Sequence, residues 1–307
     1  MARKVGVLRF GVFGLAVWIL ASAAALAQGA VVGLSLSTLN NPFFVALRDG
    51  ALQAAQKAGI QLVVLDAQDR VDKQVADIED LIQRRVRVLL VNPTDSAAVV
   101  PAIQRANQAG IPVITVDRAA SGGKVAYHIA SDNVAGGRMA AEFICNLLKG
   151  RGKVVELEGI PGTSAARDRG QGFNAYLKEK CPGVTVVARQ TANFDRAQGL
   201  SVMENILQAQ RDIDAVFAHN DEMALGALQA IKASGRKIPV VGFDATPDAV
   251  KAVEACEMAA TVAQQPAEMG RLAVEKAVEL IRGTKAPAQT QFIPVPLKLV
   301  TNPRCNW

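Results

Sequence analysis

Short runs of aliphatic and β-branched residues alternate with longer segments of helical periodicity along most of the chain. In one such segment, residues 71–84, Val75, Ile78 and Leu81 share a face. Strands that alternate with helices of this length are typical of β-α-β units, whose strands form parallel sheets. The expected strands are residues 31–37, 61–66, 88–91, 112–116, 154–158, 184–190, 215–218 and 239–243, and the expected helices are residues 42–58, 71–84, 98–109, 163–180, 196–209, 221–233 and 266–282.

These elements fall into two groups of similar size. About four units precede residue 120 and about four follow residue 150, with strand 239–243 closing the second group. No proline-rich, glycine/serine-rich or charged linker separates the groups, and 307 residues suit about two domains. The expected fold class is therefore α/β, with two closely joined lobes that each contain a parallel sheet.

The N-terminal residues have the order of a secretory signal peptide. Three basic residues precede a largely apolar stretch, residues 10–26, whose end is rich in alanine. Cleavage after Ala27 would remove residues 1–27 and leave an exported protein. A membrane anchor is the alternative, because the apolar stretch is near the lower length limit of a bilayer span.

The net charge of the whole chain overstates that of the exported protein. The sequence has 34 Lys+Arg against 28 Asp+Glu, a formal charge of +6. Residues 1–27 contain three of the basic residues and no acidic one, which leaves 31 against 28, or +3. A charge this small gives no indication of nucleic-acid binding.

Polar side chains follow several of the expected strands at the point where each strand ends. In open α/β sheets, ligands bind outside the carboxyl ends of the strands. Asparagine and aspartate at these places can instead cap the following helix. Their number, together with Arg118 and the pair Phe43 and Phe44, favours a polar binding cleft. The polar positions are Asn40, Asn41, Asn92, Asp117, Asn220, Asp221 and Asp244.

Motifs for catalysis, metal binding and cofactor binding are weak. The two histidines, His128 and His219, lie in no zinc motif, and the chain has neither a nucleophile elbow nor a P-loop. The letters G-x-G-x-x-A at residues 170–175 fall inside an expected helix, so they do not indicate a dinucleotide site. We therefore expect no catalytic residues, no metal and no cofactor.

The four cysteines lack C-x-x-C spacing and allow three pairings. Export permits disulfides, and buried free thiols are the alternative. Cys145 and Cys181 fall at the ends of two helical patterns of the second group, so a bridge between them is geometrically reasonable.

Eight longer runs match a known family across residues 31–300. They are Ser37–Phe44, Leu62–Asp66, Val91–Ser96, Ile111–Arg118, His128–Asn133, Gly162–Gly170, Asn220–Leu228 and Val241–Asp244. With these runs, the sequence resembles the ribose-binding proteins of ABC importers, which are periplasmic sugar-binding proteins of type I.

The resemblance implies the type I periplasmic-binding fold. Two Rossmann-like lobes would be joined by three crossings, near Ala130, Gln264 and Pro294, and would close over the sugar about this hinge. The first lobe would comprise residues 28–130 and 265–293. The second lobe with the hinge return would comprise residues 131–264 and 294–307.

The resemblance also implies a set of sugar ligands. Aromatic rings would pack on the C–H faces of the sugar, while arginines donate, aspartates accept and amides do both toward its hydroxyls. A sugar that lacks a hydroxyl would leave buried groups unpaired, at about 1–3 kcal/mol each. The expected ligands are Asn41, Phe43, Phe44, Asp117 and Arg118 from the first lobe, Arg169, Phe194, Asn220, Phe243 and Asp244 from the second, and Gln264 at a crossing.

Two features depart from the family pattern. His219 precedes Asn220 where the family has glutamine, and it could support the site or tune its response to pH. The four cysteines are also not part of the pattern. Neither departure falls on an expected direct ligand.

The resemblance implies a non-enzymatic, periplasmic receptor that delivers D-ribose or a close relative to a membrane ABC permease. It would act as a monomer, and a chemoreceptor is a further partner that the same geometry allows. One alternative is a receptor for another monosaccharide, such as allose or a hexose. A sugar-responsive transcription regulator shares the core fold but has a helix-turn-helix at its N-terminus. An enzyme would need paired carboxylates, whereas Arg118 and Arg169 favour ionised, ligand-holding Asp117 and Asp244.

Overall fold

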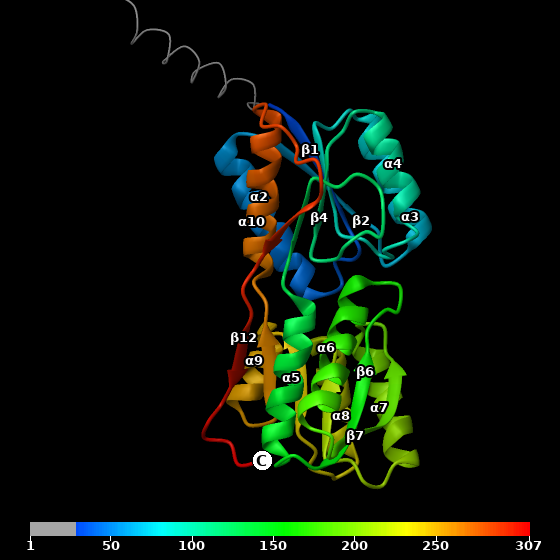
Figure 1. The fold of residues 1–307 in the computed structure, drawn as a ribbon, viewed down its shortest axis with the longest axis vertical. Coiled ribbons are helices and arrows are strands. Elements are labelled where there is room, and N and C mark those ends of the chain that lie inside the picture. The colour runs from blue at the N-terminus through cyan, green and yellow to red at the C-terminus, as the bar shows by residue number, and fades with distance from the viewer. Residues whose placement is uncertain (1–28) are drawn as a thin grey trace, which may run out of the picture.

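The protein is described by a computed structural model that defines residues 29–307. The expected signal peptide, residues 1–27, lies outside the described residues. Between residues 29 and 307, no helix has both the length and the apolar character needed to cross a membrane. Figure 1 shows two lobes stacked along the long axis, each with a sheet at its centre.

The first lobe, uppermost in Figure 1, contains a six-stranded sheet in which all pairs are parallel. Its strands are β1 (Val31–Leu36), β2 (Gln61–Asp66), β3 (Val88–Val91), β4 (Val113–Val116), β5 (Tyr127–Ala130) and β11 (Gln291–Pro294), and its helices are α2 (Pro42–Ala58), α3 (Val71–Gln83), α4 (Val100–Gln108) and α10 (Pro266–Ile281). The strand order is β11-β5-β4-β3-β1-β2. One apolar cluster packs α2 and α10 on the sheet and another packs α3 and α4, so both faces are covered.

The second lobe repeats this plan. Its strands are β6 (Gly152–Glu158), β7 (Val184–Thr191), β8 (Ala215–Ala218), β9 (Val240–Asp244), β10 (Ala260–Ala263) and β12 (Lys298–Thr301), and its helices are α5 (Asn133–Leu147), α6 (Ser164–Lys180), α7 (Arg196–Ala209), α8 (Asp221–Ala233) and α9 (Pro247–Glu254). The order is β12-β10-β9-β8-β6-β7, and only β12 runs antiparallel to its neighbour. Two apolar clusters again cover the two faces.

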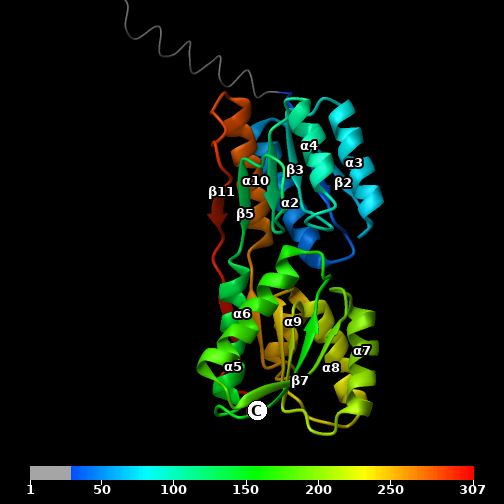
Figure 2. The same cartoon turned by 45° about the vertical axis from the view of Figure 1, so that its right-hand side comes forward.

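The chain passes between the sheets three times. It leaves the first sheet after Ala130, returns after Ala263, and crosses again between Pro294 and Lys298. Figure 2 shows the last of these segments, with β11 running along β5 before the chain descends to the second lobe. Strands from distant parts of the sequence therefore complete each sheet.

The expected helices and strands are present, and further elements extend them. The second sheet does not close with β9, because β10 and β12 add two strands to it, and β5 and β11 extend the first. β11 and β12 come from the end of the chain and pair with β5 and β10, and local periodicity does not show such pairs. The helices α5 and α9 complete the set.

Several expected boundaries differ from the structure by one or two residues, and one of them has a clear local reason. The helix expected from residue 98 begins at Val100. The carboxylate of Asp95 accepts hydrogen bonds from the backbone N–H groups of Ala97 and Ala98, both at 2.8 Å. These bonds hold the residues before the helix in a turn.

Helices α2 and α10 approach each other closely because glycines lie at their contact. A Cβ atom on Gly50 would fall 2.1 Å from the carbonyl oxygen of Ala267, and one on Gly270 would fall 2.1 Å from that of Leu47. This contact joins a helix near the start of the chain to one near its end, so it fixes the returning segment to the first lobe.

Two disulfides are present in the second lobe. Cys145–Cys181 links the end of α5 to the end of α6, which confirms the expected bridge. Cys256–Cys305 ties the C-terminal segment beyond β12 to the turn after α9, across a sequence separation of 49. The part of the chain that the structure describes has no free cysteine.

Removal of the Cys256–Cys305 bridge by a double Cys→Ser substitution should lower the free energy of unfolding by about 2–4 kcal/mol, because the unfolded chain gains the freedom of a long loop. Urea unfolding monitored by circular dichroism measures this loss.

Before that experiment, alkylation under denaturing conditions should label four thiols with reductant and none without it. Labelling without reductant would contradict the pairing.

Candidate functional site

The carboxyl ends of the strands of both sheets face a small cavity between the lobes. The free space around its side chains, adjoining solvent included, is about 230 Å³. Ten of the eleven expected ligands line it, and Ala165 joins them. The lining residues are Asn41, Phe43, Phe44, Asp117, Arg118, Ala165, Arg169, Phe194, Asn220, Asp244 and Gln264.

Phe243 has a different place from the one expected. It is fully buried and does not line the cavity. Its ring lies beneath the guanidinium of Arg169, with 3.9 Å between the ring centroid and Cζ. Phe243 therefore supports a lining residue, and any contact with a ligand passes through Arg169.

The lobes are closed against each other beside the cavity. The N–H of Ser96 in the first lobe donates to the carbonyl of Gly162 in the second at 2.9 Å. The N–H of Ala119 donates to the hydroxyl of Ser164 at 2.8 Å. These direct bonds between loops hold the two halves of the cavity together.

Arg118 connects the aromatic residues of both lobes. Its guanidinium lies 5.1 Å from the ring centroid of Phe44 in α2 and 5.2 Å from that of Phe194, on the loop after β7. Both distances lie within the range of cation–π attraction. The side chain is nearly fully buried, and the only carboxylate within 4 Å of it among the described residues is that of Asp117, at 3.9 Å.

Arg169 is held by direct hydrogen bonds from its position in α6. Its Nε donates to Oδ1 of Asn133 at 2.8 Å, and its Nη1 donates to the carbonyl of His219 at 2.7 Å. Nη1 also lies 3.8 Å from Oδ1 of Asp244. These contacts fix the guanidinium at the cavity.

The two aspartates and Phe194 have unusual backbone conformations. Their φ angles are 63° at Asp117, 121° at Asp244 and 60° at Phe194, a region that residues with a Cβ rarely adopt. Such conformations cost free energy and occur at sites where the surrounding structure enforces them. Here they place three side chains at one cavity.

The environments of Asp117 and Asp244 differ from the expectation. Both lie near arginines, as expected, but burial outweighs this attraction. Burial raises the pKa of Asp117 above its ordinary value, although Arg118 and Arg169 oppose the rise. Burial raises the pKa of Asp244 still further, against the opposing charge of Arg169.

Three buried polar atoms at the cavity have no hydrogen-bond partner among the described residues. They are Oδ1 of Asp117, Nε of Arg118 and Oε1 of Gln264. The other ends of two of these groups are bonded: Asn92 donates to Asp117 at 3.3 Å, and Gln264 donates to Asp244 at 2.8 Å. Buried polar atoms in proteins are rarely left unpaired, so these atoms indicate a polar ligand with both donors and acceptors.

The asparagines serve as helix caps and line the cavity as well. Oδ1 of Asn41 accepts from the N–H of Phe43 at the start of α2, and Oδ1 of Asn220 accepts from the N–H of Met223 at the start of α8. The amide nitrogen of Asn220 donates to the carbonyl of Phe194 at 3.2 Å. Each asparagine can therefore cap a helix with its side-chain oxygen and still line the binding cavity.

Several supporting residues were not expected from the sequence. Asn133 holds Arg169, and Asn92, which was noted only as a polar residue after a strand, holds Asp117. Gln74 donates to the carbonyl of Asn92 at 2.9 Å from α3. The run His128–Asn133, beside the crossing expected near Ala130, could have indicated Asn133.

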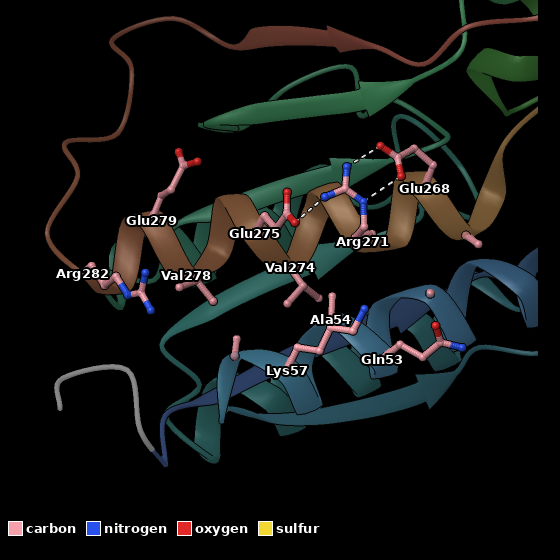
Figure 3. A pocket seen from close by; sticks show the side chains of 13 residues that line it. Gln53, Ala54, Lys57, Glu268, Arg271, Val274, Glu275, Val278, Glu279 and Arg282 are labelled. Atoms are coloured by element: carbon pink, nitrogen blue, oxygen red, sulfur yellow. Dashed lines mark hydrogen bonds and ion pairs between the residues drawn. The ribbon is translucent and has the colours of Figure 1, made fainter. Parts of the chain in front are cut away.

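A larger groove lies away from the strand ends, on the outer side of the first lobe between α2 and α10 (Figure 3). There Arg271 pairs with Glu268 and Glu275 on the same helix, as the dashed lines in Figure 3 show. Three of the groove's charged side chains thus pair with one another. No group of three or more metal-ligating side chains occurs within residues 29–307.

The closed two-lobed fold, with a polar cavity at the strand ends, defines a binding protein for a small polar ligand. A family model described as periplasmic binding protein domain matches residues 32–285. The chain belongs to this family of periplasmic binding proteins.

Known relatives agree with this assignment. The ribose import binding protein RbsB of Bacillus subtilis is 52% identical over 88% of this chain and 87% of its own length. The D-allose-binding periplasmic protein of Escherichia coli is 34% identical over 87% of this chain and 90% of its own. The crystal structure of a Caulobacter myo-inositol binding protein, with myo-inositol bound, has a TM-score of 0.84 at 37% identity and covers 88% of this chain and 93% of that one.

Asp221 follows Asn220 in the chain, and its carboxylate is buried next to the cavity without lining it. It accepts from the N–H of Thr246 and from the hydroxyl of Thr261, both at 2.7 Å. Burial nevertheless raises the pKa of Asp221 from 3.8 to about 7. The folded protein therefore keeps a proton on this group at pH values where the unfolded chain has lost it.

This difference predicts a pH dependence of stability that Asp221→Asn removes. From pH 4 to pH 7, the contribution of Asp221 to the free energy of unfolding should fall, by at most about 1.4 kcal/mol per pH unit. An asparagine can accept from Thr246 and donate to Thr261 without titrating. Urea unfolding of both proteins at several pH values should show the variant gaining relative stability as the pH rises, whereas a constant difference would contradict the prediction.

Proposed function

We propose that this protein is a periplasmic receptor that binds D-ribose in the cavity between its lobes and delivers it to the membrane permease of an ABC importer. Its ligands would be the ten expected residues that line the cavity, with Phe243 acting through Arg169. The observation that supports this most strongly is the set of unpaired buried donors and acceptors at Asp117, Arg118 and Gln264.

The chemistry of the cavity suits a monosaccharide. Each sugar hydroxyl can donate and accept at once, so it can pair with an unpartnered carboxylate oxygen and a guanidinium N–H. Phe44 and Phe194 offer apolar surfaces for the C–H faces of the ring. Two arginines and two aspartates line the cavity together, so it offers both donors and acceptors to the hydroxyls of an uncharged ligand. The small volume favours a single sugar over an oligosaccharide.

The relatives favour ribose over the alternative sugars. Identity to the relative named for ribose import is 52%, against 34% for the relative named for D-allose. The chain aligns with 87% and 90% of the lengths of these two relatives, so each comparison includes nearly the whole receptor. A receptor for allose or another hexose is the second candidate, and a transcription regulator is disfavoured by the expected signal peptide.

The remaining properties follow from the same proposal. The protein would be exported to the periplasm by residues 1–27, act as a monomer without catalysis, and present both lobes to the permease, or to a chemoreceptor, when closed. The lobes would be residues 28–130 with 265–293, and residues 131–264 with 294–307. β11 extends through Pro294, one residue beyond the limit of the first lobe.

Calorimetry of the mature protein against a panel of monosaccharides tests the ligand. We expect micromolar or tighter binding of D-ribose and much weaker binding of D-arabinose, in which one inverted hydroxyl leaves buried groups unpaired. D-Allose and D-glucose should also bind much more weakly, because each carries an additional hydroxymethyl group that the small cavity must accommodate. No binding of D-ribose, together with tight binding of another sugar, would overturn the assignment. Turnover of any sugar in the panel would show that the protein is an enzyme.

Substitution of Arg169 tests the place of the site. Arg169→Ala should weaken D-ribose binding by about 2–5 kcal/mol, because it removes a buried donor and leaves Asp244 without its counter-charge. Arg138→Ala is the matched control, since Arg138 lies on the same lobe in a partly exposed pair with Glu179. The control should bind as the wild type does. Equal affinities of all three proteins would show that the site lies elsewhere.

A further inference from the structure

A polar cluster lies behind the cavity, in the second lobe, and none of its side chains lines the cavity. At its centre is Glu156 on β6, whose side chain is fully buried. Its carboxylate accepts from Nδ2 of Asn174 at 3.0 Å and from Nε of Arg189 at 2.8 Å, and lies 3.0 Å from Nε2 of His219. Burial alone would raise the pKa of Glu156, but the bonds from His219, Asn174 and Arg189 hold it below its usual value.

The bonds of His219 define one tautomer of its ring. The N–H of Gly159 donates to Nδ1 at 3.3 Å, so Nδ1 has no proton. Nε2 must then hold the proton and donate it to Glu156. The ring is fully buried, so both nitrogens depend on these partners.

His219 and Gly159, which the imidazole bond connects, each contact a residue that lines the cavity. The carbonyl of His219 itself accepts from Nη1 of Arg169 at 2.7 Å. Gly159 packs against Phe194 so closely that a Cβ atom added to the glycine would lie 2.0 Å from the ring. The imidazole therefore joins the backbone that holds Arg169 to the backbone that supports Phe194.

We propose that His219 is a positioning residue for the ligand: its neutral ring, fixed by Glu156 and Gly159, sets the places of Arg169 and Phe194 at the cavity. The inference rests on the proposed function, because it assumes that these two residues contact D-ribose. A displaced backbone at residue 219 would move the guanidinium of Arg169, and a displaced Gly159 would move the ring of Phe194.

The proposal predicts which side chains can replace His219. Glutamine has an acceptor oxygen and a donor nitrogen at the end of a long side chain, so it can accept from Gly159 and donate to Glu156 together. Asparagine has the same groups but is too short to reach both partners. Leucine fills a similar volume and offers neither group, which leaves Gly159 and Glu156 each without one bond.

The experiment measures the dissociation constant of D-ribose by calorimetry for His219→Gln, His219→Asn and His219→Leu, with thermal unfolding of each protein. We expect the glutamine variant to bind within about twofold of the wild type, and the leucine variant to bind roughly tenfold more weakly or worse, as for one displaced hydrogen bond. The asparagine variant should lie between them. If His219→Leu does not fold, the comparison of glutamine with asparagine carries the test.

His128→Leu is the matched control, because His128 is the other histidine of the chain and bonds only Thr115 by its ring. It should change stability and leave the affinity for D-ribose unchanged. Equal affinity of all His219 variants would overturn the proposal and show a purely structural role. That outcome is distinct from failure of the proposed function, in which the wild type does not bind D-ribose or Arg169→Ala binds as the wild type does.

Discussion

Two buried guanidinium groups from opposite lobes share one aromatic ring. Arg118 and Arg169 lie 5.2 Å and 5.8 Å from the centroid of Phe194. Burial lowers the pKa of both arginines, because the closed cavity disfavours their charged forms. The rest of the site offsets this cost: Asp117 and Asp244 lie beside the guanidinium groups, and carbonyls and Asn133 accept hydrogen bonds from them.

The positions of these groups follow from the repeated β-α-β plan. Parallel strands bring their carboxyl ends to one edge, so residues far apart in sequence reach the same cavity. The sequence patterns therefore predicted the lobes, most helices and the polar residues after the strands. They did not predict β5, β10, β11 and β12: β11 and β12 come from the end of the chain and pair with β5 and β10, contacts that local periodicity does not show.

Within the site, residue type was easier to predict than role. Phe243 was expected to contact the ligand, but it lies beneath Arg169. The sequence alone does not show on which side of β9 its ring packs. The direction of the aspartate pKa shifts depends on burial, which neighbouring arginines in the sequence do not show. The positive φ angles at Asp117, Phe194 and Asp244 are likewise enforced by tertiary packing.

The Cys256–Cys305 bridge gives the hinge an unusual topology. Between these cysteines the chain leaves the second lobe, forms α10 and β11 in the first lobe, and returns to pair β12 with β10. Two of the three crossings thus belong to one covalent ring that passes through both lobes. A mechanical load applied to the two ends of the chain would pass through the sulfur atoms of Cys256 and Cys305 instead of through the residues between them. These two crossings would therefore bear tension only through their packing against the lobes.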